Sequence, residues 1–75
     1  MDDAEAAYRR LVGKRIRVAR VWQDLAQDKL AAKAGVTRNF VSAIERGAQG
    51  IDAYRLRRLA EALGMAVGEL LEGEE

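Results

Sequence analysis

Apolar residues recur along most of the chain at spacings of three and four, which is typical of amphipathic helices. Proline is absent, and no stretch alternates apolar and polar residues as a half-buried strand does. Gly35, Gly47 and Gly64 each follow one periodic segment and precede another, where a left-handed C-terminal cap is expected. The pattern predicts an all-α fold, a compact bundle of about five short helices.

The predicted helices cover residues 4–21, 27–34, 38–46, 53–63 and 67–71. Thr37 and Asp52 stand where the third and fourth helices need N-terminal caps. Gly13 lies inside the first helix, where glycine costs up to about 1 kcal/mol relative to alanine. It therefore marks close packing against another helix or the tail. The residues expected to face the core are Val12, Ile16, Ala19, Leu30, Ala31, Ala34, Val41, Ile44, Leu56, Leu59, Ala60, Leu63, Val67, Leu70 and Leu71.

The joint between the second and third predicted helices is short, comprising only the residues AGVT at positions 34–37. Two short helices joined by three or four residues that include glycine form a helix-turn-helix unit. The second helix of such a unit enters the major groove of DNA. This joint is the first indication of a nucleic-acid partner.

Length and residue types exclude several classes of function. A chain of 75 residues allows one domain, residues 1–75, with a modest core. Without Cys or His it lacks the ligands for zinc or haem and the usual nucleophiles, so we expect no enzyme activity, no metal and no cofactor. The carboxylate pairs Asp2/Asp3 and Glu74/Glu75 lie at the termini, where we expect frayed chain.

The sequence carries no signal for a membrane or for a small-molecule ligand. No apolar run approaches the roughly 18 to 20 residues that span a bilayer. The chain opens on acidic residues, whereas a secretory signal opens on basic ones. We therefore expect a cytoplasmic, nucleoid-associated protein with no membrane partner.

Charge is distributed unevenly along the chain. Residues 6–60 hold all thirteen Lys and Arg against four acids, and the remaining charged residues at both ends are acidic. The centre therefore carries +9 and the ends −8, although the net charge is +1. A basic centre suits a polyanion. A solvated, Arg-rich helical surface is the plain alternative.

Four segments carry a resemblance to a known family: GKRIRVAR at 13–20, QDKLAAKAGVT at 27–37, VSAIERG at 41–47 and LRRLAEALG at 56–64. From Val12 to Leu71 the chain resembles the Cro and phage-repressor type of helix-turn-helix domain, the XRE-like family of small bacterial and phage transcription regulators. The chain departs from that family at Ala26, where a capping Ser or Thr is usual, and at Ile51 and Ala66. Either Asp24 replaces the missing cap at Ala26 or the start of the second helix is frayed.

The resemblance implies roles for individual residues in DNA binding. Gln27, at the start of the second helix, would bind a backbone phosphate together with nearby amides. The third helix would present Arg38, Asn39, Ser42 and Ala43 to base edges, since Arg suits guanine, Asn suits adenine and Ala suits the thymine methyl. An exposed polar side chain without function is the alternative for each. The other expected phosphate contacts are Thr37, Arg46, Gln49 and Arg55.

Three further expectations concern packing. The family pattern places Arg20 against Glu45 as a partly buried ion pair. Phe40, beside the base-reading residues, is expected to pack rather than to flank the DNA backbone. Apolar residues of the first helix cover an arc of about 160°, wider than the roughly 100° that a core-facing stripe needs. We expect the fifth helix to cover the Leu11, Val18 and Trp22 edge, and Leu70, Leu71 and Trp22 to form a dimer interface; intramolecular packing of Trp22 is the alternative.

These features together predict a sequence-specific DNA-binding transcriptional regulator. It would bind double-stranded DNA at a palindromic operator, as a homodimer with its third helix in the major groove. The alternative is an antitoxin-like protein-interaction module that binds DNA secondarily.

Overall fold

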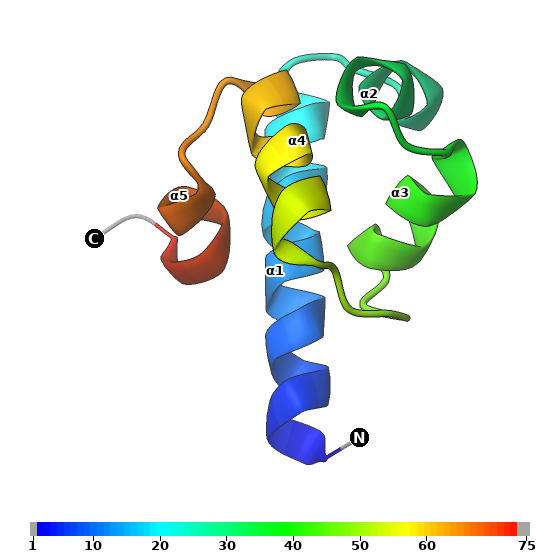
Figure 1. Cartoon of the computed structure of the whole chain (residues 1–75). Coiled ribbons are helices and arrows are strands. Elements are labelled where there is room, and N and C mark those ends of the chain that lie inside the picture. The colour runs from blue at the N-terminus through cyan, green and yellow to red at the C-terminus, as the bar shows by residue number, and fades with distance from the viewer. Residues whose placement is uncertain (1, 74–75) are drawn as a thin grey trace.

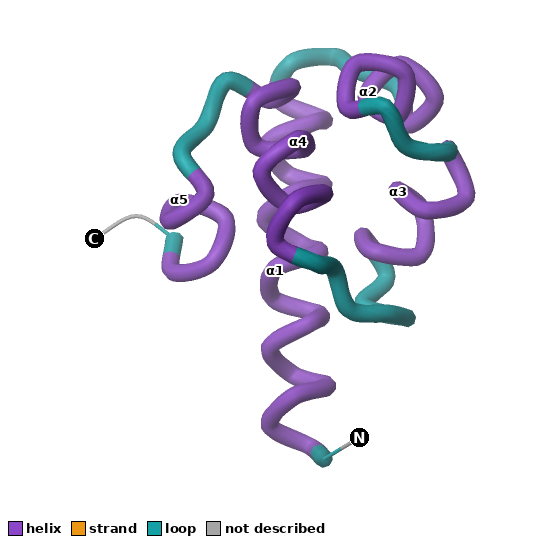
Figure 2. Tube along the Cα trace, viewed as in Figure 1, coloured by secondary structure: helices purple, strands orange, loops and turns teal. Residues whose placement is uncertain are grey.

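The computed structural model describes residues 2–73, which form five helices and no strand (Figure 1; Figure 2). The all-α prediction is confirmed, and each helix begins and ends within about one residue of its predicted bounds. The helices are α1 (Asp3–Trp22), α2 (Gln27–Ala34), α3 (Arg38–Glu45), α4 (Ala53–Leu63) and α5 (Val67–Glu72).

The long helix α1 runs through the middle of the molecule, with α2 and α3 on one side and α5 on the other (Figure 1). Helix α4 packs on α2 and also contacts α1 and α5. The N-terminal turns of α1 extend beyond the other helices (Figure 1). All five helices contribute to one cluster of buried residues, in which Ile16, Leu30, Val41, Leu59 and Leu70 are completely enclosed.

Gly13 brings α1 and α3 into backbone contact. A methyl group at this position would overlap the carbonyl oxygen of Ile44 and would lie 3.0 Å from the carbonyl oxygen of Glu45. No side chain fits in that space, because both obstacles are backbone atoms. The predicted close packing at Gly13 is therefore confirmed, and α3 is its partner.

Local capping groups fix the joint between α2 and α3 and the start of α4. Gly35 ends α2 in the left-handed region, with φ of 73°. The Thr37 hydroxyl accepts a hydrogen bond from the Phe40 amide at 3.0 Å, and Asp52 accepts one from the Arg55 amide at the start of α4. Both predicted caps are confirmed. The start of α2 has no side-chain cap, so Asp24 does not replace the one missing at Ala26.

Long side chains from α1, from its C-cap and from α4 bind the carbonyl groups at three helix ends. The Arg15 guanidinium donates to the carbonyl oxygens of Leu70 and Leu71, at 3.2 and 2.6 Å, and so fastens α5 to α1. In the same way Gln23 donates to the last carbonyl of α4, and Arg58 donates to the last carbonyl of α2. These bonds satisfy groups that a helix leaves unpaired at its end.

The expectation of frayed chain at both termini has a different outcome at each end. Asp2 is not frayed, because its side chain caps α1 by accepting the Glu5 amide at 2.7 Å. Gly73 caps α5 through its amide and the Glu69 carbonyl. Glu74 and Glu75 lie outside the described residues.

The prediction that α5 covers the apolar edge of α1 is wrong. Tyr8 and Arg15 hold α5 by hydrogen bonds to its last carbonyls, so it docks to one side of that edge. The edge itself stays exposed, at 44% for Leu11, 45% for Val18 and 83% for Trp22.

The assignment of Leu70 to a dimer interface is also wrong. Its side chain is completely buried in the core of this chain and leaves no surface for a partner. Leu71, the next residue along α5, is half-buried, and Trp22 stays open to a partner.

Candidate nucleic-acid interface

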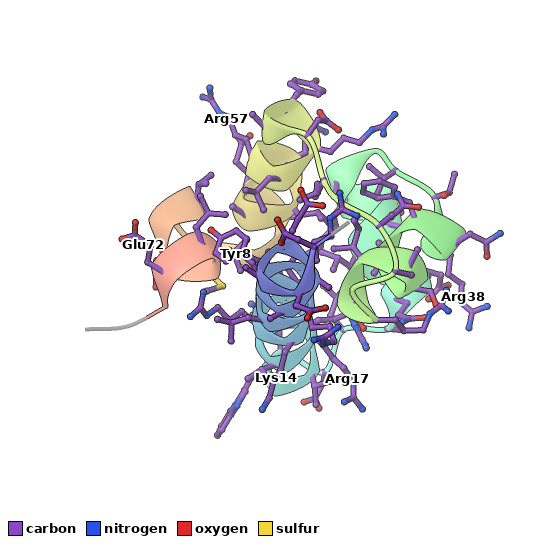
Figure 3. The ribbon with its side chains drawn as sticks, turned by 90° about the horizontal axis from the view of Figure 1, so that it is seen from below. Tyr8, Lys14, Arg17, Arg38, Arg57 and Glu72 are labelled. Atoms are coloured by element: carbon purple, nitrogen blue, oxygen red, sulfur yellow. The ribbon has the colours of Figure 1, made fainter. Side chains whose placement is uncertain are left out.

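Helix α3 buries one face and exposes the other. Val41 and Ile44 point into the core, as predicted, while Arg38 and Asn39 in the first turn are exposed. Arg38 points away from the body of the molecule (Figure 3). Ser42 and Ala43, one turn further along, are half-buried. The first turn of α3 therefore offers the most accessible polar groups of this helix.

A buried ion pair fixes α3 against α1. The Arg20 guanidinium donates to both carboxylate oxygens of Glu45, at 2.7 and 2.9 Å. The side chains are only 13% and 3% exposed, so the predicted partly buried pair is present. The hydrogen bonds to Glu45 raise the pKa of Arg20, so this guanidinium stays charged throughout the physiological range.

The same carboxylate also positions Gln27. Its side-chain nitrogen donates to Glu45 Oε1 at 3.1 Å, which links the start of α2 to the end of α3. A primary amide carries two hydrogens, so the second remains available to a ligand. The Gln27 and Asp28 amides have no acceptor among residues 2–73, because no helical turn precedes them; the first backbone bonds of α2 run from Lys29 and Leu30 to the Ala26 carbonyl. The start of α2 thus presents several donors together, as anion binding requires.

Arg55, at the start of α4, lies against α3. Its guanidinium carbon is 5.1 Å from the centre of the Phe40 ring, and the group also pairs with Asp52 at 3.6 Å. Phe40 is half-buried and packs against the core, so the packing prediction is confirmed. Stacking on an aromatic ring restricts the Arg55 side chain near the first turn of α3.

The remaining predicted phosphate contacts surround α3. The Thr37 hydroxyl accepts an amide hydrogen and keeps its own proton for donation. The exposed Arg46 follows α3 and bonds the Ser42 carbonyl, and Gln49 is exposed in the loop that leads to α4. The predicted DNA-contact residues thus belong to consecutive parts of one region: the start of α2, α3, the following loop and the start of α4.

Sequence reasoning assigned no role to an exposed basic row on α1, formed by Arg10, Lys14 and Arg17. Their spacing of four and three places them on one side of the helix. Lys14 and Arg17 point outward in similar directions (Figure 3). Arg10 packs over Gly47, the residue that follows the α3 C-cap, so this row lies next to the end of α3. The spacing was the signal that could have identified it.

Residues 2–73 hold no group of three or more carboxylates that could bind a metal ion. Within the same range, no helix is both long enough and apolar enough to cross a membrane.

Two short helices joined by three residues define a helix-turn-helix domain, and here the second helix begins with an exposed polar turn. The family model described as helix-turn-helix matches residues 16–70. The chain therefore belongs to the helix-turn-helix family, in its Cro and phage-repressor (XRE-like) branch.

Individual relatives agree with this assignment. The uncharacterized HTH-type transcriptional regulator y4aM of Sinorhizobium fredii is 40% identical over 52 residues, which cover 69% of this chain and 36% of that protein. Controller protein C.AhdI of Aeromonas hydrophila has a similar structure, with 33% identity, a TM-score of 0.83 and coverage of 85% of this chain and 97% of that one. The P22 c2 repressor, solved with a synthetic operator, has 31% identity, a TM-score of 0.81 and the same coverages. This chain spans between 36% and 63% of the length of the first curated relatives that it matches.

Proposed function

We propose that this chain is a sequence-specific DNA-binding domain of a transcriptional regulator, with α3 in the major groove. The observation that carries the proposal is the first turn of α3, where Arg38 and Asn39 are exposed on a helix whose other face is buried. The Thr37 cap and the Arg20–Glu45 pair hold that helix in place. The similarity to the P22 c2 repressor, which was solved with an operator, supports the same orientation of the motif.

Base reading and backbone binding fall to different residues. Arg38 can form two hydrogen bonds to guanine, and Asn39 can form two to adenine. The half-buried Ser42 and Ala43 would add further contacts to base edges. Gln27, Thr37, Arg46, Gln49 and Arg55 would bind phosphates on either side of the groove. On this proposal the protein acts at nucleoid DNA in the cytoplasm and needs no metal, cofactor or small-molecule ligand.

The proposal includes a homodimer on a palindromic operator. One domain of this size, here residues 1–75, reads only a few base pairs, and two-fold pairing doubles the site. Half-sites would then lie about 10 base pairs apart, one helical turn, so that both α3 helices meet the same side of the DNA. Trp22 and Leu71 remain the candidates for the dimer contact.

Selection of binding sites from random duplexes with the purified protein tests this function. We expect the enriched sequences to share a two-fold symmetric site. Recovery of duplexes no different from the starting pool would contradict sequence-specific binding and would favour the antitoxin-like alternative, in which a protein partner is the main ligand. Enrichment of an asymmetric site would contradict the homodimer while leaving base reading intact.

A further inference from the structure

A groove of about 660 Å³ lies between α1 and the segment that contains α5. Its lining is mainly apolar and includes Leu11, Val18 and Trp22 from α1 and Met65 from the turn before α5. This volume is within the range of sites that bind a ligand or a partner side chain. The groove exists because α5 docks beside the apolar edge of α1 instead of over it.

Trp22 is the most exposed large apolar side chain of the described residues, at 83%. It lines the groove of its own chain but leaves most of its ring in solvent. With Leu11 and Val18 it makes a continuous apolar surface along one side of α1. Soluble proteins rarely leave such a surface open unless a partner covers it, and Trp is the residue type that most often dominates an interface.

The groove carries opposite charges on its two sides. Lys14 lines the α1 side and Glu69 lines the α5 side. Within residues 2–73 neither forms an ion pair, although one Glu69 oxygen accepts the Ala66 amide at 2.9 Å. Glu72 at the end of α5 points away from the direction of Lys14 (Figure 3). The groove is therefore basic along one side, acidic along the other and apolar between them.

That arrangement is self-complementary under a two-fold axis. In a symmetric dimer, residue i of one copy meets residue j of the other, and residue j meets residue i. If Lys14 of one copy lies opposite Glu69 of the other, the two-fold axis repeats the same pair a second time, and the two apolar surfaces lie in contact between them. A ligand of a single charge, or an apolar ligand, would satisfy only one side.

We propose that a second copy of this chain occupies the groove, with Trp22 of each copy entering the groove of the other and two Lys14–Glu69 pairs formed across the interface. The inference rests on the proposed homodimer and specifies its surface. It replaces Leu70, which is buried, by residues that are open to a partner.

A charge exchange tests this interface. Lys14→Glu alone places two carboxylates opposite each other twice in the dimer, and Glu69→Lys alone does the same with two ammonium groups. Each variant should raise the dimer dissociation constant at least about tenfold in sedimentation equilibrium. An equimolar mixture of the two variants should restore association, because the mixed dimer contains both pairs with opposite charges. Restoration in the mixture is the result expected when these two residues face each other across the dimer.

Trp22→Ser provides a second line of evidence, because Glu69→Lys also removes the acceptor for the Ala66 amide. It should weaken association by at least about tenfold. Tyr54→Ser and Arg57→Glu on α4 are matched controls, since both residues are exposed and lie outside the groove, and they should leave association unchanged. Circular dichroism checks that every variant is folded.

Three results would overturn the proposal: a parent protein that sediments as a monomer, folded Trp22→Ser and Lys14→Glu variants that associate like the parent, or a mixture that associates no better than its components. A small apolar ligand or a helix of another protein as the natural occupant would produce the first result. Failure of the DNA-binding proposal is distinguishable, because the sedimentation measurements contain no DNA.

Discussion

The Glu45 carboxylate accepts hydrogen bonds from two side chains that precede it by 25 and 18 residues. Arg20 binds it from α1 and Gln27 binds it from α2, at distances between 2.7 and 3.1 Å. A buried carboxylate without a cation is costly, because the protein interior solvates charge poorly. The structure therefore joins the stability of the fold to the placement of Gln27, the proposed phosphate ligand.

Replacing Arg20 by alanine should lower the free energy of unfolding by about 2 to 4 kcal/mol, because Glu45 would remain buried without its partner. Arg17→Ala, on the exposed side of the same helix, is the matched control. Denaturant titration measures both. Equal shifts of the two midpoints would contradict a structural role for Arg20. The raised pKa of Arg20 means that the contribution of its charge is complete at neutral pH and is lost only as the pH rises into the strongly alkaline range.

Contacts to the DNA phosphate backbone should contribute equally to the binding of all DNA sequences. Gln27→Ala and Arg55→Ala should each weaken binding to the selected site and to random duplexes by similar factors. Loss of the Arg55 cation should also reduce the slope of log affinity against log salt by about 1. Arg57→Ala, which removes an exposed arginine elsewhere on α4, should leave affinity unchanged. A change of sequence preference with Arg55→Ala would show instead that it reads bases.

The sequence predicts the bounds of a helix best where the signals for them are local. Gly35 and Gly64 end their helices in the left-handed region, and Thr37 and Asp52 cap theirs, so the bounds follow from neighbouring residues. The position of α5 depends instead on hydrogen bonds that Arg15 donates to carbonyl groups 55 and 56 positions further along the sequence. No local pattern shows those bonds.

The error at Leu70 has a related cause. Adjacent residues on a helix point about 100° apart, and a helix of six residues is too short for its periodicity to show which leucine is buried. The structure buries Leu70 and leaves Leu71 half-exposed, because Arg15 sets the orientation of α5.

The contact between α1 and α3 can be tested with two glycines. Gly13→Ala should destabilise the fold by about 1 to 3 kcal/mol, because the new methyl group meets backbone atoms of α3 that cannot move aside. Gly68→Ala in α5, where nothing lies within 4 Å of the added carbon, should instead stabilise it by about 0.5 kcal/mol. Thermal unfolding compares the two. A Gly13→Ala variant as stable as Gly68→Ala would mean that the helices do not approach this closely.

The sequence of the protein shows a basic centre, but it does not show where those charges lie in the folded molecule. Arg15, Arg20 and Arg58 are taken up by carbonyl groups and by Glu45 inside the fold. Of the exposed bases, Arg38, Arg46 and Arg55 lie around α3, and three others form the row on α1. Lys29 and Lys33 on α2 and Arg57 on α4 are also exposed. The sequence resemblance named the residues around α3, and the spacing of the α1 row is visible in the sequence, whereas the groove beside that row became evident only when the helices were packed.

The proposed function depends on the reading of base sequence by the first turn of α3. The most direct test compares binding of the parent, Arg38→Ala and Asn39→Ala to the selected duplex and to a scrambled duplex, by fluorescence anisotropy at fixed salt. Each substitution should cost about 1 to 3 kcal/mol per contact on the selected duplex, change binding to the scrambled duplex much less, and relax preference at one or two positions in each half-site. Variants that bind the selected duplex as tightly as the parent, with the same preferences, would contradict it.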